Sequence, residues 1–306
     1  MTARVYKSTG SWYVLKDASG QFMNARMKGR FKMDGLTSTN PIAVGDMVDV
    51  EPESGQETGW VIAGIHDRRN YVNRVSPARR KRHHIIASNL DQSLLVATLK
   101  DPRTSMGFVD RFLIACEAYH VPAIIAINKC DDFDDREEDM FLQWKAVYEP
   151  VGYQVLRVSG TTGEGMEALQ GLLAGRITLF SGHSGVGKST LINRLMPGLD
   201  LRTKEVSDWS GKGMHTTTFA EMFDLPDGGA IIDTPGVREF GLVDIEEQEL
   251  AHYFPEMRAR MHQCQFNNCQ HVNEPGCAIK NAVMAGHISE ERYISYCTIL
   301  DGLDEA

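Results

Sequence analysis

The 306-residue sequence contains no apolar run approaching the ~18 residues that a membrane-spanning helix requires. It begins MTARVYKSTGSW, which lacks the apolar segment of a secretory signal peptide, so we expect a cytoplasmic protein without a membrane partner. Internal repeats and long low-complexity tracts are absent as well. With 42% hydrophobic and 24% charged residues, the composition is typical of a soluble globular protein and excludes a wholly disordered chain. The length suggests about two domains and a small appendage.

Cysteine is also scarce, with six residues in the whole chain. Three are scattered, and the other three surround one histidine in the pattern Cys264-x4-Cys269-x-His271-x5-Cys277. In a cytosolic chain such a cluster indicates metal binding before disulfides. Three thiolates and an imidazole are a ligand set for one tetrahedral, structural Zn²⁺ ion. The alternative is three buried thiols beside a surface histidine.

The net charge of −9 is unevenly distributed along the chain. Residues 1–84 carry 14 Lys and Arg against 8 Asp and Glu, whereas the remainder carries 18 against 33. A basic N-terminal part on an acidic body is compatible with a module that contacts phosphates, and equally with an ordinary solvated surface. Residues 69–86, which include the basic run 79–84, are predicted to be a linker that is either a solvated tether or a phosphate-contacting segment.

The hydrophobic pattern predicts three folded parts. Residues 1–68 contain short strand-like runs at 12–15, 22–26, 43–50 and 60–65, which favour a small barrel of the OB or SH3-like kind. Residues 87–243 alternate helical stretches, such as 110–119 and 139–148, with apolar strands at 94–99, 123–127, 155–158, 177–180 and 230–232. This alternation is typical of a parallel α/β sheet. Residues 244–306 are predicted to be mostly helical and to end in an amphipathic helix over 290–303.

The strongest single motif lies between the predicted strand 177–180 and a predicted helix. It matches G-x-x-x-x-G-K-S, in which glycines let backbone N–H groups approach phosphates at a helix N-terminus. Lys188 is expected to reach the β- and γ-phosphates, and Ser189 to bind Mg²⁺. The alternative is a glycine-rich turn with an exposed lysine. The expected nucleotide-binding residues are Gly182, His183, Ser184, Gly185, Val186, Gly187, Lys188, Ser189 and Thr190.

Three further loops follow predicted strands. The first, Asp233-Thr234-Pro235-Gly236, offers a carboxylate that can hold Mg²⁺ through water and a glycine N–H for the γ-phosphate. The second, Asn128-Lys129-Cys130-Asp131, offers an aspartate that can accept hydrogen bonds from guanine N1–H and N2–H₂. The third begins at Ser159-Gly160, whose backbone can contact guanine O6. Each match is weak alone, but together they predict a GTP site at the carboxyl ends of the strands.

The order of these motifs is unusual. Ordinary GTPases of the translation-factor class run from the phosphate loop through switch I and DxxG to NKxD and the SAK-like loop. This chain runs NKCD, SGT, GHSGVGKS and then DTPG, which indicates a circular permutation. With its predicted barrel and its cysteine cluster, the sequence resembles the RsgA (YjeQ/YloQ) family of small ribosomal subunit biogenesis GTPases. The resemblance spans nearly the whole chain and depends on NKCD, GHSGVGKST, GMHTTT, DTPGVREF and the Cys/His pattern.

The resemblance implies an N-terminal OB-fold barrel, a central circularly permuted GTPase domain and a mostly helical zinc-binding module. It implies a GTP hydrolase that binds GTP and GDP with Mg²⁺. Its partner would be the small (30S) ribosomal subunit and its rRNA, with the protein acting late in assembly or maturation. The subunit would stimulate hydrolysis, and hydrolysis would be coupled to release. Nothing in the sequence indicates an isologous dimer, so a monomer is the default expectation.

The hydrolytic residue is less evident from the sequence. Ras-like enzymes place a glutamine after the DxxG glycine to orient water, but here that residue is Val237. The resemblance points instead to His215, which can orient or deprotonate water near neutral pH. The alternative is an ordinary loop histidine. The resemblance also implies that Thr217, in the polar switch I segment 200–218, completes the Mg²⁺ shell with Ser189.

Three other functions remain open at this point. One is a GTPase with a different RNA or protein partner. Another is a GTP-gated RNA-binding protein with little catalysis of its own. The third is an adenine-specific kinase that uses the phosphate loop, against which Asp131 argues because adenine lacks the donor pair that this carboxylate would accept.

Overall fold

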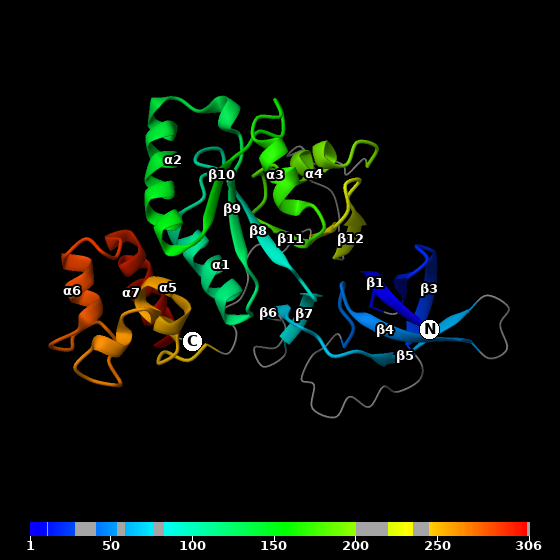
Figure 1. Ribbon diagram of the computed structural model, residues 1–306, viewed down its shortest axis with the longest axis horizontal. Helices are drawn as coiled ribbons and strands as arrows, with labels where there is room; N and C mark the ends of the chain where they lie inside the picture. The colour runs from blue at the N-terminus through cyan, green and yellow to red at the C-terminus, as the bar shows by residue number, and fades with distance from the viewer. Residues whose placement is uncertain are drawn as a thin grey trace, which may run out of the picture.

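The computed structural model describes residues 1–10, 12–27, 41–53, 59–75, 83–199, 220–234 and 245–304. A small barrel, a larger α/β sheet and a helical C-terminal part follow one another along the chain (Figure 1). Among the residues described, no helix has both the length and the apolar character needed to cross a membrane.

The N-terminal part is a closed five-stranded barrel, formed by β1 (Thr2–Ser8), β2 (Tyr13–Asp17), β3 (Phe22–Met27), β4 (Met47–Pro52) and β5 (Trp60–Ile65). The strand order is β1-β2-β3-β5-β4, and pairing of β4 with β1 closes the barrel. β3 runs parallel to β5, while the other barrel neighbours are antiparallel. Five strands in this order form the OB-fold, so that prediction is confirmed and the SH3-like alternative is wrong. The core contains Val5, Leu15, Val48 and Ile62.

The predicted strand 43–50 is shorter in the structure, because β4 begins only at Met47. The carboxylate of Asp46 is fully buried and accepts hydrogen bonds from the Ala43 backbone (2.8 Å) and from Arg68 (2.7 Å). These bonds fold residues 43–46 into a turn. At Gly45 (φ +96°) a Cβ atom would lie 2.1 Å from the carbonyl oxygen of Ser88, so only glycine permits this approach of the barrel to the next segment.

The segment predicted as a linker is partly folded. β6 (Tyr71–Val75) and β7 (His83–Ser88) form an antiparallel ribbon. Val72 and Ile86 are buried in one cluster with Leu179 of the central sheet, so the ribbon packs on the α/β part instead of forming a solvated tether. The sequence did not predict these two strands, because basic residues dominate the segment and apolar residues are few. Residues 76–82 lie outside those described.

The central sheet has five parallel strands in the order β10-β9-β8-β11-β13. An antiparallel strand, β12 (Glu221–Asp224), pairs with β13 at the edge. All five predicted apolar runs fall within or overlap strands, and the predicted parallel α/β architecture is confirmed. The parallel strands are β8 (Gln92–Ala97), β9 (Ala123–Ile127), β10 (Gln154–Arg157), β11 (Ile177–Ser181) and β13 (Ala230–Asp233).

Helices cover both faces of this sheet. α1 (Met106–Ala118) and α2 (Asp135–Tyr148) pack in one core cluster with Leu95, whereas α3 (Met166–Leu173) and α4 (Lys188–Leu195) pack in another with Leu94. Adjacent strand residues therefore point to opposite, equally apolar faces, as expected for a parallel sheet. Two short 3₁₀ turns, η1 (Cys130–Asp132) and η2 (Glu149–Val151), flank α2.

The barrel joins the edge of the central sheet through β12. Strand β1 pairs with β12 at Lys7 and Glu221, and these two side chains form an ion pair of 2.7 Å. Next to them the Tyr6 hydroxyl donates to Asp224 (2.6 Å). One eleven-stranded sheet therefore runs from β10 through the barrel to β4.

The C-terminal part packs against α1. Its elements are η3 (Leu250–Tyr253), α5 (Pro255–Arg258), η4 (Met261–Gln263), α6 (Ala278–Met284) and α7 (Glu290–Asp304). The prediction of a mostly helical part ending in a helix over 290–303 is confirmed. Phe254, Met257 and Tyr296 form its core together with Ile114 of α1.

A buried ionic group holds the C-terminal part on the central domain. Arg292 of α7 is fully buried and donates to Asp110 of α1 (2.7 Å) and to Glu256 of α5 (2.8 Å). Its guanidinium lies 4.6 Å from the ring centre of Phe254. Because an unpaired charge in such an interior costs several kcal/mol, about 3–5 for a broken pair, these groups require one relative position of α1, α5 and α7.

Candidate nucleotide site and metal centre

The predicted nucleotide-binding loops meet at one edge of the central sheet. NKCD follows β9, Ser159-Gly160 follows β10, the glycine-rich loop follows β11, and Asp233 ends β13. These four strands and β8, which lies between β9 and β11, are parallel, so their carboxyl ends lie at the same edge of the sheet, where open α/β sheets bind ligands.

Asn128 connects three of these loops. Its side chain is buried, donates from Nδ2 to the Val186 carbonyl (2.8 Å) and accepts at Oδ1 from the Gly160 backbone N–H (3.2 Å). At Gly187 (φ +90°) a Cβ atom would lie 2.4 Å from Asn128 Nδ2. The glycine therefore allows the phosphate loop to close on the asparagine.

Two other residues of NKCD, Asp131 and Cys130, differ in their exposure to solvent. The exposed Asp131 accepts a hydrogen bond from the Ser159 hydroxyl, and Ser159 Oγ in turn accepts from the Thr162 backbone N–H (2.9 Å). This arrangement orients the carboxylate before any ligand arrives. The side chain of Cys130 is buried instead, and this burial raises the pKa of its thiol to about 11.

Lys188 is the first residue of α4, and its ammonium group folds over the glycine-rich loop. Nζ donates to the carbonyls of Gly182 and His183, the latter at 3.0 Å. Burial lowers the pKa of Lys188 and raises the pKa of Asp233, and the attraction between the two charges opposes both shifts. Among the described residues, Asp233 Oδ1 is buried without a hydrogen-bond partner, which fits a group that awaits a cation or its bound water.

Three predicted catalytic or magnesium-binding residues, His215, Thr217 and Gly236, lie outside the described residues. Their roles stay predictions. The structure describes Ser189 in the first turn of α4, directly after Lys188 and half-buried.

Sequence reasoning missed one loop at this edge. Residues Thr98–Ser105 connect β8 to α1, and β8 lies between β9 and β11. The carbonyl of Asp101 accepts a hydrogen bond from Lys129, and Thr104 contacts His183. Its position directly after a predicted central strand could have indicated that this loop lies at the same edge of the sheet.

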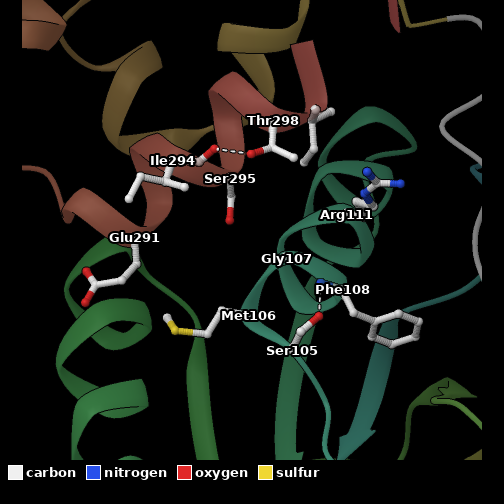
Figure 2. A pocket seen from close by; sticks show the side chains of 10 residues that line it. Ser105, Met106, Gly107, Phe108, Arg111, Glu291, Ile294, Ser295 and Thr298 are labelled. Carbon is white, nitrogen blue, oxygen red and sulfur yellow. Dashed lines mark hydrogen bonds between the residues drawn. The ribbon is translucent and has the colours of Figure 1, made fainter. Parts of the chain in front are cut away.

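A cleft of about 570 Å³ opens beside this site, between the N-terminal half of α1 and α7 (Figure 2). Met106, Phe108 and Ile294 give it apolar walls, and Arg111 and Glu291 are its ionisable lining residues. Its lining does not include the glycine-rich loop, NKCD or Asp233, so the groups suited to nucleotide chemistry converge elsewhere.

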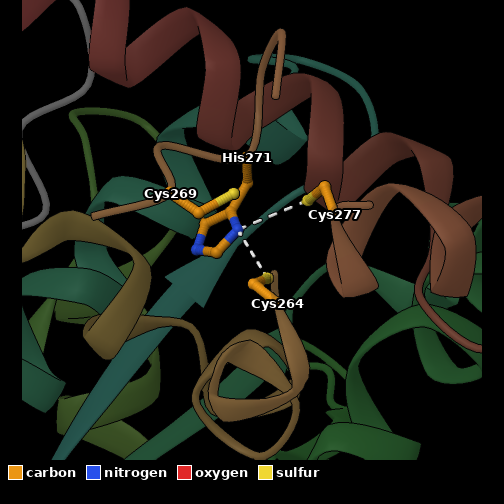
Figure 3. A group of neighbouring side chains, drawn as sticks. All are labelled: Cys264, Cys269, His271 and Cys277. Atoms are coloured by element: carbon orange, nitrogen blue, oxygen red, sulfur yellow. Dashed lines mark hydrogen bonds between the residues drawn. The ribbon is translucent and has the colours of Figure 1, made fainter. Parts of the chain in front are cut away.

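The four predicted metal ligands come together in the C-terminal part (Figure 3). One ligand atom from each of Cys264, Cys269, His271 and Cys277 lies within 4.8 Å of the others. His271 Nδ1 is 3.6 Å from the Cys264 sulfur and 3.5 Å from the Cys277 sulfur. Tetrahedral zinc bonds would separate nitrogen and sulfur by about 3.5 Å, so the side chains present fit a metal ion.

Backbone contacts support the cluster. Glu274 accepts hydrogen bonds from the N–H groups of Gln270 (2.7 Å) and Val272 (3.1 Å), and the Tyr293 hydroxyl donates to the His271 carbonyl (2.8 Å). The thiols of Cys116, Cys130 and Cys297 do not belong to the group. The geometry thus favours a metal ion over the alternative of buried thiols beside a surface histidine.

Together, the parallel sheet, the phosphate loop, NKCD and the rotated motif order define a circularly permuted GTPase. Two family models match the chain: RsgA N-terminal domain over residues 2–61 and RsgA GTPase over residues 65–243. The chain therefore belongs to the RsgA GTPase family and is a GTP hydrolase.

Relatives agree over the whole length. The small ribosomal subunit biogenesis GTPase RsgA of Flavobacterium psychrophilum is 50% identical, with 100% of this chain and 94% of that protein covered. The RsgA of Bacteroides fragilis is 49% identical, covering 100% and 98%. The crystal structure of YjeQ from Thermotoga maritima has a TM-score of 0.81 at 32% identity, covering 99% of this chain and 98% of that one. YloQ, described as a circularly permuted GTPase, has a TM-score of 0.76 at 28% identity, covering 99% and 95%.

Proposed function

We propose that this GTPase is a late-stage assembly or maturation factor of the small (30S) ribosomal subunit, acting in the cytoplasm as a monomer. The subunit and its rRNA stimulate hydrolysis, and hydrolysis is coupled to release. Full-length relatives that carry the name small ribosomal subunit biogenesis GTPase support this proposal. An OB-fold barrel followed by the basic segment 69–84 is also a suitable surface for RNA phosphates and bases.

The single observation that carries the nucleotide assignment is the bonding of Asn128 to both the phosphate loop and Gly160. It holds the guanine-reading and phosphate-binding loops at a set separation without a ligand. In the proposed complex, Asp131 accepts from guanine, the Gly182–Thr190 backbone and Lys188 hold the phosphates, and Gly236 contacts the γ-phosphate.

Mg²⁺, when bound with GTP, would neutralise charge that develops on the phosphate oxygens. Ser189 and Thr217 would hold the ion, and Asp233 would hold one of its waters. Asp233 Oδ1 is buried without a partner in the part of the chain that the structure describes, which supports this part of the proposal. In the C-terminal part, Cys264, Cys269, His271 and Cys277 would hold one structural Zn²⁺, the ion that three thiolates and an imidazole prefer.

A turnover assay tests the proposed function. GTP hydrolysis is measured with Mg²⁺ alone, with small subunits and with large subunits. We expect slow intrinsic turnover and a rise of about 10³-fold or more with small subunits, because completing a GTPase site in trans gives such gains. An equal response to large subunits, or no response to either, would exclude the proposed partner.

His215 supplies a second test within that assay. We expect His215→Ala to lower kcat about 10²-fold or more while leaving the Kd for GDP unchanged, because general-base or water-orienting groups contribute at that level. His120→Ala is a control, since His120 lies at the far end of α1 in the turn before β9. Unchanged turnover in His215→Ala would remove this residue from the mechanism.

A further inference from the structure

The loop Thr98–Ser105 touches both halves of the nucleotide site. Near its middle, the Asp101 carbonyl accepts a hydrogen bond from Lys129 of NKCD. Pro102 lies against the phosphate loop, where a Cβ atom on Gly185 would be 3.3 Å from Pro102 Cδ. At its end, Thr104 contacts the phosphate-loop residue His183. The loop therefore contacts both the guanine-binding and the phosphate-binding segments. It follows β8 and Gly160 follows β10, and these two strands lie on opposite sides of β9.

Thr104 has the geometry of a fixed clamp. Its side chain is 2% exposed, and its Oγ1 accepts from the Thr98 backbone N–H (3.0 Å) and lies 2.7 Å from His183 Nε2. His183 Nδ1 lies 3.3 Å from the Ser184 carbonyl oxygen, which can only accept. In a neutral ring Nδ1 therefore carries the proton, and Nε2 accepts from the Thr104 hydroxyl. The Thr104 hydroxyl thus accepts from Thr98 and donates to His183, which joins the loop to the phosphate loop.

The surroundings keep the imidazole in this state. Burial and the Lys188 charge lower the pKa of His183, which favours the neutral ring. The imidazole and the Phe108 ring pack in a T-shaped arrangement, with centroids 5.5 Å apart and planes at 87°. The His183 backbone carbonyl also accepts from Lys188 Nζ (3.0 Å). A shift of His183 would thus move an anchor of the phosphate-binding lysine.

We propose that Thr104 is a positioning residue for the nucleotide: through its hydroxyl bond to His183 it holds the phosphate loop in the conformation that receives the β-phosphate. This inference rests on the proposed role of Gly182–Thr190 in binding phosphates. It assigns to the loop between β8 and α1 a function that none of the nucleotide-binding motifs covers.

The test compares three variants by GDP binding and by GTP turnover. Thr104→Val keeps the shape but removes the hydroxyl, Thr104→Ser keeps the hydroxyl, and His183→Phe keeps a ring on Phe108 without the acceptor. We expect Thr104→Val and His183→Phe each to raise the Kd for GDP about 10-fold, the loss typical of one buried hydrogen bond with its partner left unpaired. Thr104→Ser should stay within about twofold of the unmodified protein.

Two readouts separate positioning from mere support of the fold. KM for GTP should rise with the Kd, while kcat at saturating GTP stays within about twofold, because the contact acts on binding and not on the attacking water. In the double variant Thr104→Val, His183→Phe the two fold-changes should not multiply, because either single variant already abolishes the Thr104–His183 contact. A role confined to stability would lower the melting temperature and leave the Kd, measured well below melting, unchanged.

Outcomes that overturn the inference are distinct from those that overturn the proposed function. The proposed role of Thr104 is wrong if Thr104→Val binds GDP like the unmodified protein while Lys188→Ala loses GDP binding. It is also wrong if the two fold-changes multiply. In both cases the proposed role of the phosphate loop is unaffected. If the unmodified protein does not bind GDP, or Lys188→Ala binds it equally well, the proposed nucleotide site itself is wrong. If Thr104→Val does not fold, His183→Phe alone decides, because its side chain is at the partly exposed end of the contact.

Discussion

Replacing Asp131 with asparagine is expected to transfer the preference of this GTPase from GTP to xanthosine triphosphate. The carboxylate of Asp131 is exposed at the sheet edge and already oriented by the Ser159 hydroxyl. Guanine presents two donors, N1–H and N2–H₂, to such a carboxylate. Hydrogen bonds to a charged group are worth about 1.5–3 kcal/mol each, so their loss should weaken GTP binding by about 10²-fold or more.

The reversal follows from the pairing of donors and acceptors. An asparagine presents one oxygen and one NH₂ group, and the NH₂ would face the guanine amino group, donor against donor. Xanthine carries an oxygen in place of that amino group and accepts from the NH₂, so its triphosphate regains a complete pair. The asparagine oxygen can still accept from Ser159, so the loop itself should remain folded.

The measurement is competition of GDP, XDP and ADP for the site in both proteins. Asp132→Asn is the matched control, because Asp132 is the adjacent carboxylate and is 70% exposed, with Lys100 at 3.6 Å as its ion-pair partner. It should leave the guanine preference unchanged. An Asp131→Asn protein that still prefers GDP over XDP would show that this carboxylate does not recognise the base.

The sequence predicts the parts of the site that are local in the chain. Each loop motif lies directly after an apolar strand, so the sheet topology alone brings NKCD, Ser159 and the glycine-rich loop together. The four proposed metal ligands lie within fourteen positions of one another, which makes their convergence predictable from spacing. Local pattern and global arrangement agree in these cases.

Contacts between distant segments were not predictable in this way. Arg292 pairs with Asp110 across 182 positions, and nothing in the neighbourhood of either residue identifies the other as its partner. Thr104 and His183 are 79 positions apart and carry ordinary side chains. The β6–β7 ribbon was not predicted for a different reason. The apolar Val72 and Ile86 lie in a basic segment, and a basic composition is typical of a solvated linker.

Removing the metal is expected to unfold the C-terminal part while the GTPase domain stays folded. The core around Phe254 and Tyr296 is small, and Cys277, one of the four proposed ligands, is itself 2% exposed within that core. The same sulfur accepts from the Lys280 backbone at the start of α6 (3.5 Å). In small zinc domains the metal supplies about 10–16 kcal/mol of folding free energy, more than such a core retains without it.

Two variants and a chelator test this expectation. Cys277→Ser should lower the metal content from about one zinc per chain toward zero, and should remove amide-exchange protection from α6 and α7, as the chelator does with the unmodified protein. Cys297→Ser is the matched control, because this thiol lies in α7 of the same part but outside the ligand group. Metal bound with undiminished affinity by Cys277→Ser would contradict the assigned ligand set.

The loss should also reach the GTPase domain, through Arg292. When α7 unfolds, the fully buried Asp110 loses its guanidinium partner and keeps the Tyr148 hydroxyl (3.0 Å). Breaking a buried pair costs about 3–5 kcal/mol, so the remaining domain should melt at a lower temperature than in the intact protein. Asp110→Asn should reduce this coupling, because the amide carries no charge to leave unpaired, and its melting temperature should fall less on metal removal. An equal fall in both proteins would show that the ionic group does not transmit the loss of the metal.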